Sequence, residues 1–294
     1  MKYPDFLCIG ARKAGTTWLH ENLAKQPAVY LPPVKEMHYL DHSHTWLFQR
    51  LFGRAAYLRN AREHLGKSLL AFRRGGSWQE LKWAAKYCLM PRNDTWYQSL
   101  FSSEDRLCGE VCPGYARLGL DQVAAVAKRM PDTRIIYFMR DPLECAWSSA
   151  GAHFSKKGRG VGVMQENPED VKRYLAKSSS VLHLSFARNL ANWREHYPEE
   201  QILLSYFDDL KSNPRDVYKR VLRFIGLDDS DEFIPSDVVQ KLGTKEGRRS
   251  REIPEDYAFF LAKLYVDSLE ELNVLVDNEH ARRWLADARA ILDA

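Results

Sequence analysis

A run of glycine, hydroxyl and basic residues near the N-terminus has the composition of an anion-binding turn. It spans residues 10–18 (GARKAGTTW) and follows a short apolar run. A glycine-bearing turn between a strand and a helix directs backbone N–H groups at one point, where the helix dipole also favours negative charge. Nucleotide-binding P-loops have glycine, four residues, glycine, lysine and a hydroxyl residue. Here Gly10 and Gly15 keep that spacing, but Thr16 replaces the lysine and Lys13 supplies the cation from within the turn. Helix capping alone explains the glycines but not this lysine.

A second candidate anion site follows the clearest buried strand predicted in the chain, Arg134 to Met139. Arg140 comes directly after it, and Ser148 lies about two helical turns further on. A guanidinium offers a planar pair of donors to phosphate oxygens, and a serine hydroxyl adds a neutral donor. Asp141 and Pro142 are explained by a helix start. An arginine at the carboxyl end of a strand, however, lies where open α/β sheets bind ligands. Two such sites suit a ligand with two separated phosphates.

Glu36 and His38 are candidates for proton transfer. If the chain is extended here, side chains two residues apart point to the same side and can share one acceptor group. A hydroxyl that attacks an electrophile must lose its proton, which requires a carboxylate or imidazole within hydrogen-bond distance. An isolated Glu-x-His pair is more often part of a surface loop. Its closeness in sequence to the glycine turn favours the catalytic interpretation.

The elements that must position these residues alternate between short apolar runs and helical stretches. Strands separated by helices favour a parallel sheet covered on both faces, so we expect a three-layer α/β fold with a central parallel sheet flanked by helices. The expected strands are residues 6–10, 107–111, 134–139 and 201–205, and the expected helices are about 16–25, 122–129, from 143, and 215–225.

The chain of 294 residues is expected to form one domain, residues 1–294, with two additions to the alternating pattern. A segment at about 46–100 is rich in tryptophan, leucine and basic residues and is expected to be a helical insertion. Its tryptophans suit either core packing, their commoner use, or an apolar or sugar-stacking wall. A helical segment from about residue 254 is expected to pack on the sheet or to form a lid.

Composition excludes several classes of protein. The net charge of +4 is too small to indicate a nucleic-acid binder, and no apolar stretch of 18 residues could span a membrane. The first strand begins too close to the N-terminus for a signal peptide, so we expect a cytoplasmic protein. The five scattered cysteines predict reduced structural thiols, and no cluster has zinc-ligand spacing, so no metal is expected.

Together, the two candidate phosphate motifs resemble those of sulfotransferases that depend on PAPS (3′-phosphoadenosine 5′-phosphosulfate). Residues 13–18 are similar to the loop that binds the 5′-phosphosulfate, and residues 134–148 to the 3′-phosphate site. Residues 35–41 (KEMHYLD) resemble the catalytic segment of the glycan-modifying branch, which includes heparan sulfate sulfotransferases, and its bacterial relatives. Residues 191–193 and 203–210 are similar to a later helix and strand of that branch, and residues 245–248 to a C-terminal loop over the 3′-phosphate.

The resemblance implies a P-loop-like fold and transfer of a sulfuryl group from PAPS to a hydroxyl or amine, with PAP as the product and no metal. The acceptor would be a carbohydrate, lipid or small natural product. Glu36 would be the general base with His38 and Asp41 beside it, and Lys13 would offset charge on the leaving phosphate. In the alternative, His38 is the base and Glu36 holds its tautomer. The cofactor-binding residues would be Arg12, Lys13, Ala14, Gly15, Thr16, Thr17, Trp18 (stacked on adenine), Arg140, Ser148, Lys245, Gly247 and Arg248.

One departure from the glycan-modifying branch bears on the acceptor. That branch carries Glu-Lys-Ser/Thr-Pro where this chain has Glu110-Val111-Cys112-Pro113. The missing lysine weakens the case for a highly acidic acceptor, and a neutral sugar, lipid or aromatic compound fits as well.

Two functions other than sulfuryl transfer remain open. A P-loop-type kinase would need a lysine after Gly15 and an acidic strand end for Mg²⁺. The second alternative is a module that binds PAP or another anion but has no catalytic activity.

Overall fold

The computed structural model describes residues 1–41, 66, 77–101, 103, 105–156, 167–235, 237 and 252–294. Within these residues a five-stranded sheet has the order β2-β3-β1-β4-β5, with every pair of neighbours parallel. Its strands are β1 (Phe6–Gly10), β2 (Val29–Tyr30), β3 (Leu107–Val111), β4 (Arg134–Met139) and β5 (Ile202–Tyr206).

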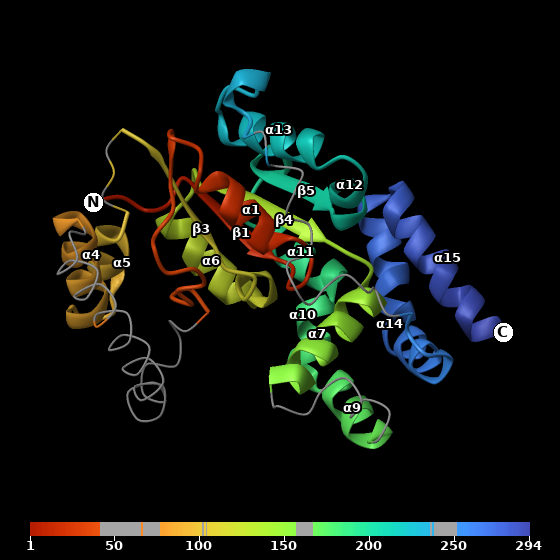
Figure 1. Ribbon diagram of the computed structural model, residues 1–294. Coiled ribbons are helices and arrows are strands. Elements are labelled where there is room, and N and C mark those ends of the chain that lie inside the picture. Colours follow the sequence, from red (N-terminus) through yellow and green to blue (C-terminus); the bar gives the residue numbers. More distant parts are fainter. Residues whose placement is uncertain are drawn as a thin grey trace.

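All strands of the sheet have their carboxyl ends at one edge, because every neighbouring pair is parallel (Figure 1). Strand β1 lies in the middle and is buried along its whole length. On one side its Cys8 pairs with Val111 of β3, and on the other its Gly10 pairs with Tyr137 of β4. This register places the residues that follow β1, β3 and β4 next to one another.

Helices cover both faces of the sheet. On one face, Trp18 of α1 (Thr16–Leu23) meets Tyr218 of α13 (Pro214–Ile225) edge to face at a centroid distance of 6.2 Å. On the other face, Phe186 of α11 (Phe186–Arg194) packs edge to face on Tyr137 of β4, at 6.0 Å. The guanidinium of Arg194 donates to the carbonyl of Leu275 at 2.9 Å, which ties α11 to α14 (Glu255–Val276). The three-layer α/β expectation is therefore confirmed.

The described part of the chain contains further helices. They are α4 (Trp78–Leu89), α5 (Asp94–Ser99), α6 (Leu120–Arg129), α7 (Pro142–Lys156), α9 (Pro168–Leu175), α10 (Ser178–Leu184), α12 (Phe207–Ser212) and α15 (Glu279–Asp293). A 3₁₀ turn, η2 (Tyr115–Arg117), follows β3. Among the described residues, no helix is both long and apolar enough to cross a membrane.

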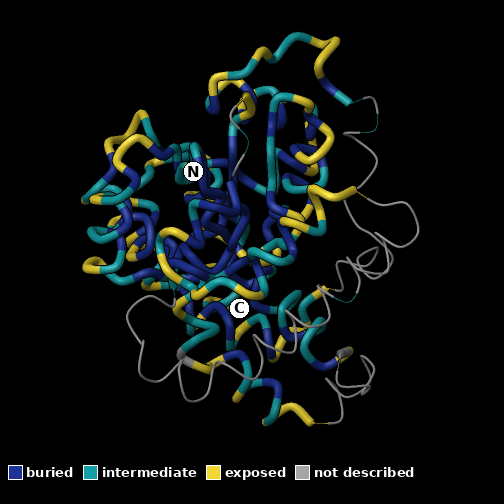
Figure 2. Tube along the Cα trace, turned by 90° about the vertical axis from the view of Figure 1, so that its left-hand side faces the viewer, coloured by how far each residue is buried: buried dark blue, intermediate teal, exposed yellow. Residues whose placement is uncertain are grey.

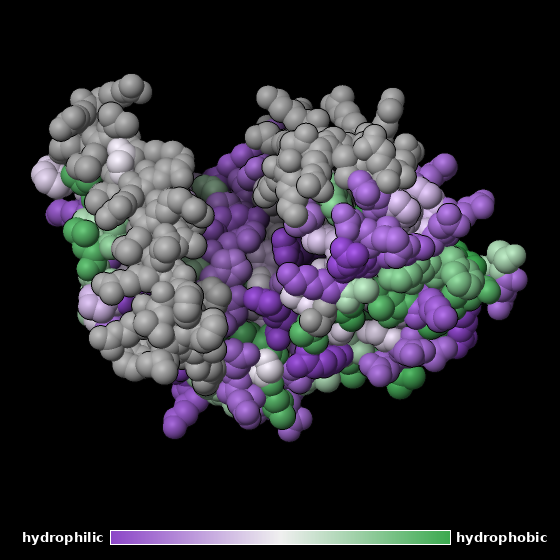
Figure 3. Space-filling view, turned by 90° about the horizontal axis from the view of Figure 1, so that it is seen from below, coloured by the Kyte–Doolittle hydropathy of each residue, from purple (hydrophilic) through white to green (hydrophobic). Residues whose placement is uncertain are grey.

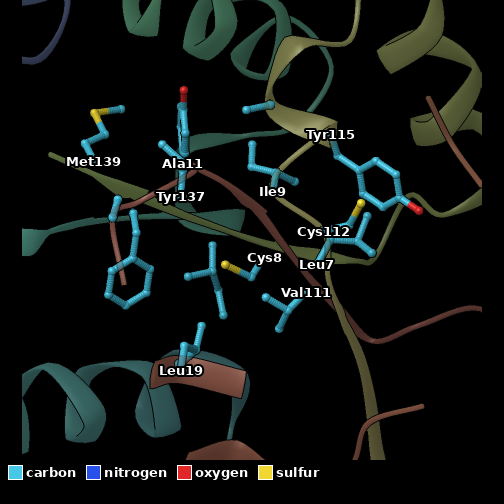
Figure 4. Close-up of a cluster of buried hydrophobic side chains, with 14 of the residues drawn as sticks. Leu7, Cys8, Ile9, Ala11, Leu19, Val111, Cys112, Tyr115, Tyr137 and Met139 are labelled. Carbon is cyan, nitrogen blue, oxygen red and sulfur yellow. The ribbon is translucent and has the colours of Figure 1, made fainter. Parts of the chain in front are cut away.

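The core follows the sheet, where buried residues concentrate in the centre of the molecule (Figure 2). A close view shows both faces of the sheet: Cys8 of β1 and Val111 of β3 lie on the side of Leu19 of α1, whereas Ile9 of β1 and Tyr137 of β4 lie on the opposite side (Figure 4). Removal of this apolar surface from water supplies about 25 cal/mol per Å². This packed core holds in place the strand ends that carry the candidate site.

The strands agree closely with the sequence-based prediction. Those at 6–10, 107–111 and 134–139 have the predicted bounds, and the fourth is shifted by one residue, to 202–206. In the segment expected to be a helical insertion, residues 78–89 and 94–99 are helical. The C-terminal segment forms two helices, and α14 packs against α7 and α11, so this part of the chain extends a helical layer.

Candidate active site

The glycine turn between β1 and α1 has the backbone geometry of a cradle. Lys13 and Gly15 both have positive φ angles, of 66° and 98°. Gly15 directly precedes α1, and a Cβ atom there would lie 2.5 Å from a methyl group of Leu210. Left-handed backbone and lack of space together require glycine at this position. The N–H groups at the start of α1 are thereby directed at the turn.

Side chains in this turn divide into exposed and buried sets. Arg12, Lys13 and Thr17 are exposed, so their polar ends can meet a ligand. Ala14 and Thr16 are buried, so a ligand above the turn would meet mainly their backbone.

Trp18 contributes to the core at the start of α1. Its side chain is buried in the core between α1 and α13, with its ring edge to face against Tyr218. This packing anchors the first turn of α1 on the core, and the stacking of Trp18 on adenine stays a prediction.

Arg140 joins the second candidate anion site to the first. Its Nη1 donates to the carbonyl oxygen of Lys13 at 3.0 Å, and its Nε donates to the Glu144 carboxylate at 2.8 Å. The guanidinium also lies over the ring of Phe207, 4.5 Å from the centroid. The two motifs are therefore adjacent, as predicted. The Glu144 carboxylate, however, already accepts a hydrogen bond from the guanidinium. Ser148, half-buried on α7, is two helical turns from this point.

Glu144 carries negative charge into the Arg140 site. Burial alone would raise the pKa of this carboxyl, but ion pairs with Arg140 and Lys211 bring the pKa below its ordinary value. The Lys211 ammonium lies 3.4 Å from the same carboxylate oxygen that Arg140 contacts. A phosphate that binds Arg140 must therefore share or displace Glu144.

The 35–41 segment brings three titratable side chains together. Nδ1 of His38 lies 2.8 Å from Oδ2 of Asp41, and Nε2 of His38 lies 3.8 Å from Oε2 of Glu36. The backbone is not extended as expected, because Glu36 and His38 have φ angles of 60° and 54°. Their side chains nevertheless lie on the same side. Two left-handed residues flanking Met37 produce the closeness that an extended chain was expected to give.

Asp41 sets the state of His38. A carboxylate only accepts hydrogen bonds, so Nδ1 of His38 donates to Asp41 and Nε2 is directed toward Glu36. The hydrogen bond to Asp41 raises the pKa of His38, against the opposing effect of burial. The tautomer is therefore held by Asp41, where the alternative hypothesis assigned that role to Glu36. A Cβ atom on Gly114 would lie 2.9 Å from both His38 and Asp41, so only glycine fits beneath this pair.

A buried carboxylate supports the 35–41 segment from below. Glu110 of β3 accepts hydrogen bonds from the backbone N–H of Met37 at 3.1 Å and from the hydroxyls of Tyr97 and Tyr115 at 2.6 and 2.9 Å. The Tyr115 hydroxyl in turn accepts from the N–H of Tyr39 at 3.0 Å. Burial raises the pKa of Glu110 to about 7. This network fixes the backbone on both sides of His38.

Lys35 links the 35–41 segment to the glycine turn. Its ammonium donates to the hydroxyl of Thr17 at 2.9 Å and lies 3.4 Å from the Glu36 carboxylate. Sequence reasoning did not assign it a role. Its place directly before Glu36, in a segment that had to meet the turn, was the signal that could have found it.

A cavity of about 400 Å³ opens beside Glu36 and His38. Figure 3 shows a hollow with hydrophilic walls on the face that lies at the bottom of Figure 1. Val111, which stands where the resembling branch has lysine, is buried in the core instead (Figure 4). Side chains lining the cavity include Arg12, Glu36, His38, Arg117, Lys177 and His183.

Some predicted features lie elsewhere or outside the described part of the chain. Lys245, Gly247 and Arg248 fall outside the described residues. The five cysteines are unpaired, as expected, and four of them are buried. Among the described residues, no group of three or more His, Cys, Asp or Glu side chains could hold a metal ion.

Comparison with known sequences identifies one family over most of the chain. A family described as "Sulfotransferase family" matches residues 4–231, a range that includes the glycine turn, the 35–41 segment and Arg140.

Solved structures share this fold at low sequence identity. A sulfotransferase from Alicyclobacillus acidocaldarius is 18% identical, with a TM-score of 0.62 over 97% of this chain and 99% of its own. The sulfotransferase domain of the olefin synthase from Synechococcus PCC 7002 is 18% identical, with a TM-score of 0.53 over 90% and 94%. A mouse sulfotransferase complexed with PAP is 14% identical, with a TM-score of 0.51 over 99% and 91%. At these identities the likeness shows a common fold.

Proposed function

The chain belongs to the PAPS-dependent sulfotransferase family, and on this premise we propose that it transfers the sulfuryl group of PAPS to a hydroxyl or amine of a carbohydrate, lipid or small natural-product acceptor. The observation that carries the proposal is the meeting of three features at one edge of the sheet. Arg140 is bonded to the glycine turn through the Lys13 carbonyl, and Lys35 joins the same turn to Glu36 through Thr17. These contacts support two neighbouring anion sites with a proton acceptor beside them.

In this proposal the glycine turn holds the 5′-phosphosulfate of the donor. Lys13 and the N–H groups at the start of α1 face its negative charge, as at other helix N-termini. Arg140 and Ser148 hold the 3′-phosphate, with Glu144 displaced from part of the guanidinium. The mouse relative that was solved with PAP supports a nucleotide with phosphates at both positions. Residues 245–248 are proposed to complete the 3′-phosphate site.

Transfer proceeds by in-line displacement. The acceptor oxygen or nitrogen attacks sulfur, the bond from sulfur to the 5′-phosphate oxygen breaks, and PAP leaves with the electron pair of that bond. Glu36 takes the proton from the acceptor, while His38, held by Asp41, orients the acceptor or Glu36. Lys13 and Lys35 offset the charge that grows on the leaving phosphate and the sulfuryl oxygens.

PAP should stabilise the protein against heat more than ADP does, because Arg140 and Ser148 bind the 3′-phosphate that ADP lacks. A ligand at a hundred times its dissociation constant adds about 2.7 kcal/mol to the free energy of unfolding. Thermal-shift curves with PAP, ADP and ATP measure the difference.

Arg140→Ala should remove the larger stabilisation by PAP than by ADP. Arg289→Ala, which removes an arginine paired with Glu270 on the surface, should leave it unchanged. Equal shifts with PAP and ADP in the wild type would refute the assignment of two phosphate sites.

Sulfuryl transfer should continue in the presence of EDTA. The charge on the leaving phosphate is offset by lysine side chains and backbone N–H groups, so the proposed mechanism requires no divalent ion. Turnover of PAPS to PAP with and without chelator, and after addition of Mg²⁺, measures this. Strict dependence on Mg²⁺, together with preference for ATP, would favour the kinase alternative. PAP binding without any turnover would favour the inactive module.

A further inference from the structure

Fixed positive charge surrounds the cavity beside His38. Among the described residues that line it, Arg12, Arg117 and Lys177 are cationic and Glu36 is the one carboxylate. These cations come from three different elements: the glycine turn, the 3₁₀ turn after β3, and the residue before α10. A solvated helix face carries its charges on one element. Convergence from three elements on one cavity indicates a ligand of opposite charge.

Arg117 lies close to the proposed proton acceptors. Its Nη2 is 3.6 Å from Oδ2 of Asp41, the same oxygen that accepts the hydrogen bond from His38. At this distance the contact is an ion pair but not a hydrogen bond. A guanidinium has five N–H donors, so Arg117 keeps donors for a ligand next to His38.

His183 of α10 lines the cavity, and the cations nearby affect its pKa. Burial lowers its pKa to about 4, and the nearby Arg117 and Arg12 contribute to the shift. The imidazole is therefore neutral at pH 7. Its Nδ1 is buried and has no hydrogen-bond partner among the described residues. The positive charge of the cavity wall therefore comes from arginine and lysine side chains and not from His183.

We propose that the acceptor carries an anionic group in addition to the group that is sulfated, and that Arg117 and Lys177 bind this anion while Glu36 and His38 face the attacking hydroxyl. The inference rests on the proposed function, because it assigns this cavity to the acceptor. The lysine that Val111 replaces is not the sole source of positive charge on the acceptor side. Arg117 and Lys177 supply it from other elements. A carboxylate, a sulfate ester and a phosphate ester share the required chemistry.

Matched pairs of acceptors test the inference. One pair is methyl glucuronide and methyl glucoside, and the other is 3-(4-hydroxyphenyl)propionate and 3-(4-hydroxyphenyl)propanol. Binding to the PAP-saturated protein and, with PAPS, kcat/KM are measured for all four. We expect the anionic member of at least one pair to be favoured tenfold or more, roughly the effect of one hydrogen bond to a charged group. The pair that responds tells whether the anion belongs to a sugar or to an aromatic acid.

Variants of the two cations connect the preference to the cavity. Arg117→Gln and Lys177→Gln should each reduce the preference for the anionic member about tenfold and leave PAP affinity unchanged. Arg289→Gln is the matched control and should change neither. If Arg117 acts only through Asp41 and His38, its loss lowers kcat for both members of a pair alike. Loss of anion binding instead raises KM for the anionic member alone.

The inference is overturned if the neutral members are bound and sulfated as well as the anionic ones, or if neither anionic probe binds the PAP-saturated protein at millimolar concentration. Uniform loss of kcat in Arg117→Gln with an unchanged preference would also overturn it. Failure of the proposed function is seen separately, because PAP would then not stabilise the protein before any acceptor is added.

Discussion

Glu36→Gln is expected to lower kcat for sulfuryl transfer about a hundredfold or more, the usual effect of losing a general base, while PAP affinity stays near that of the wild type. The amide keeps the size of the side chain and one acceptor oxygen, but it cannot take the proton. Glu36 lies 3.4 Å from Lys35 and 3.8 Å from His38, and it contacts neither Arg140 nor the backbone of the glycine turn in the structure. The proposed phosphate sites should therefore survive the substitution.

His38 variants provide the comparison for this prediction. His38→Ala should have a smaller effect than Glu36→Gln if His38 only orients its neighbours. If His38 is the base, the order of severity reverses, and the wild-type rate falls as the pH decreases through the pKa of His38. The hydrogen bond to Asp41 raises that pKa above its ordinary value, so the inflection would lie above about 6.5. Rates against pH for both variants, with PAP affinity as the control for folding, distinguish the two. Near-normal rates in both variants would show that the 35–41 segment does not carry the chemistry.

Glu110→Ala is expected to lower the free energy of unfolding by about 3 kcal/mol or more, since it leaves two buried tyrosine hydroxyls and the Met37 N–H without their acceptor. Glu199→Ala, which removes an exposed carboxylate paired with Arg194, should cost less than about 1 kcal/mol. Urea unfolding at pH 7 measures both. Activity should fall with Glu110→Ala as well, because Met37 lies between the two residues proposed to handle the proton. A loss of stability no larger than that of Glu199→Ala would contradict the supporting role.

The titration of Glu110 adds a pH dependence to this prediction. Its pKa in the folded protein, about 7, lies above the ordinary value of 4.5. The folded state therefore binds more protons than the unfolded state between these values, and stability declines as the pH rises from about 4.5 to 7. Glu110→Gln keeps the size of the side chain but does not titrate. The free energy of unfolding of the wild type minus that of Glu110→Gln should thus be more positive at pH 5 than at pH 8.

The parts of the fold that the sequence predicted well are those encoded locally. A buried parallel strand is a continuous apolar run, and the runs at residues 6–10 and 134–139 are long enough to identify. Strand β2 was not predicted, because two residues carry no periodicity. The meeting of Arg140 with the glycine turn followed from parallel strands having their carboxyl ends at one edge.

The details of the site depended on contacts between distant segments. Nothing near Trp18 in the sequence shows that Tyr218 packs against its ring, and nothing near His38 shows that Glu110 holds the backbone beside it. Left-handed backbone at Glu36 and His38 is unusual for side chains of this kind, so propensity alone predicts an extended chain. Lys177, which directly precedes α10, and His183 of α10 line the cavity although they lie more than a hundred residues after His38 in sequence.

The ion pair between Arg140 and Glu144 places a carboxylate of the protein at the guanidinium that is proposed to bind a phosphate. Glu144 and the Lys13 carbonyl orient the guanidinium, and the carboxylate offsets its charge. If Arg140 binds the 3′-phosphate as proposed, donor binding exchanges one anion for another. A ligand that contacts both the glycine turn and Arg140 would offset the loss of the internal pair better than a ligand held at Arg140 alone. Under the proposed assignment of the two phosphates, the carboxylate of Glu144 would thus favour a doubly phosphorylated nucleotide over a competitor held at only one site.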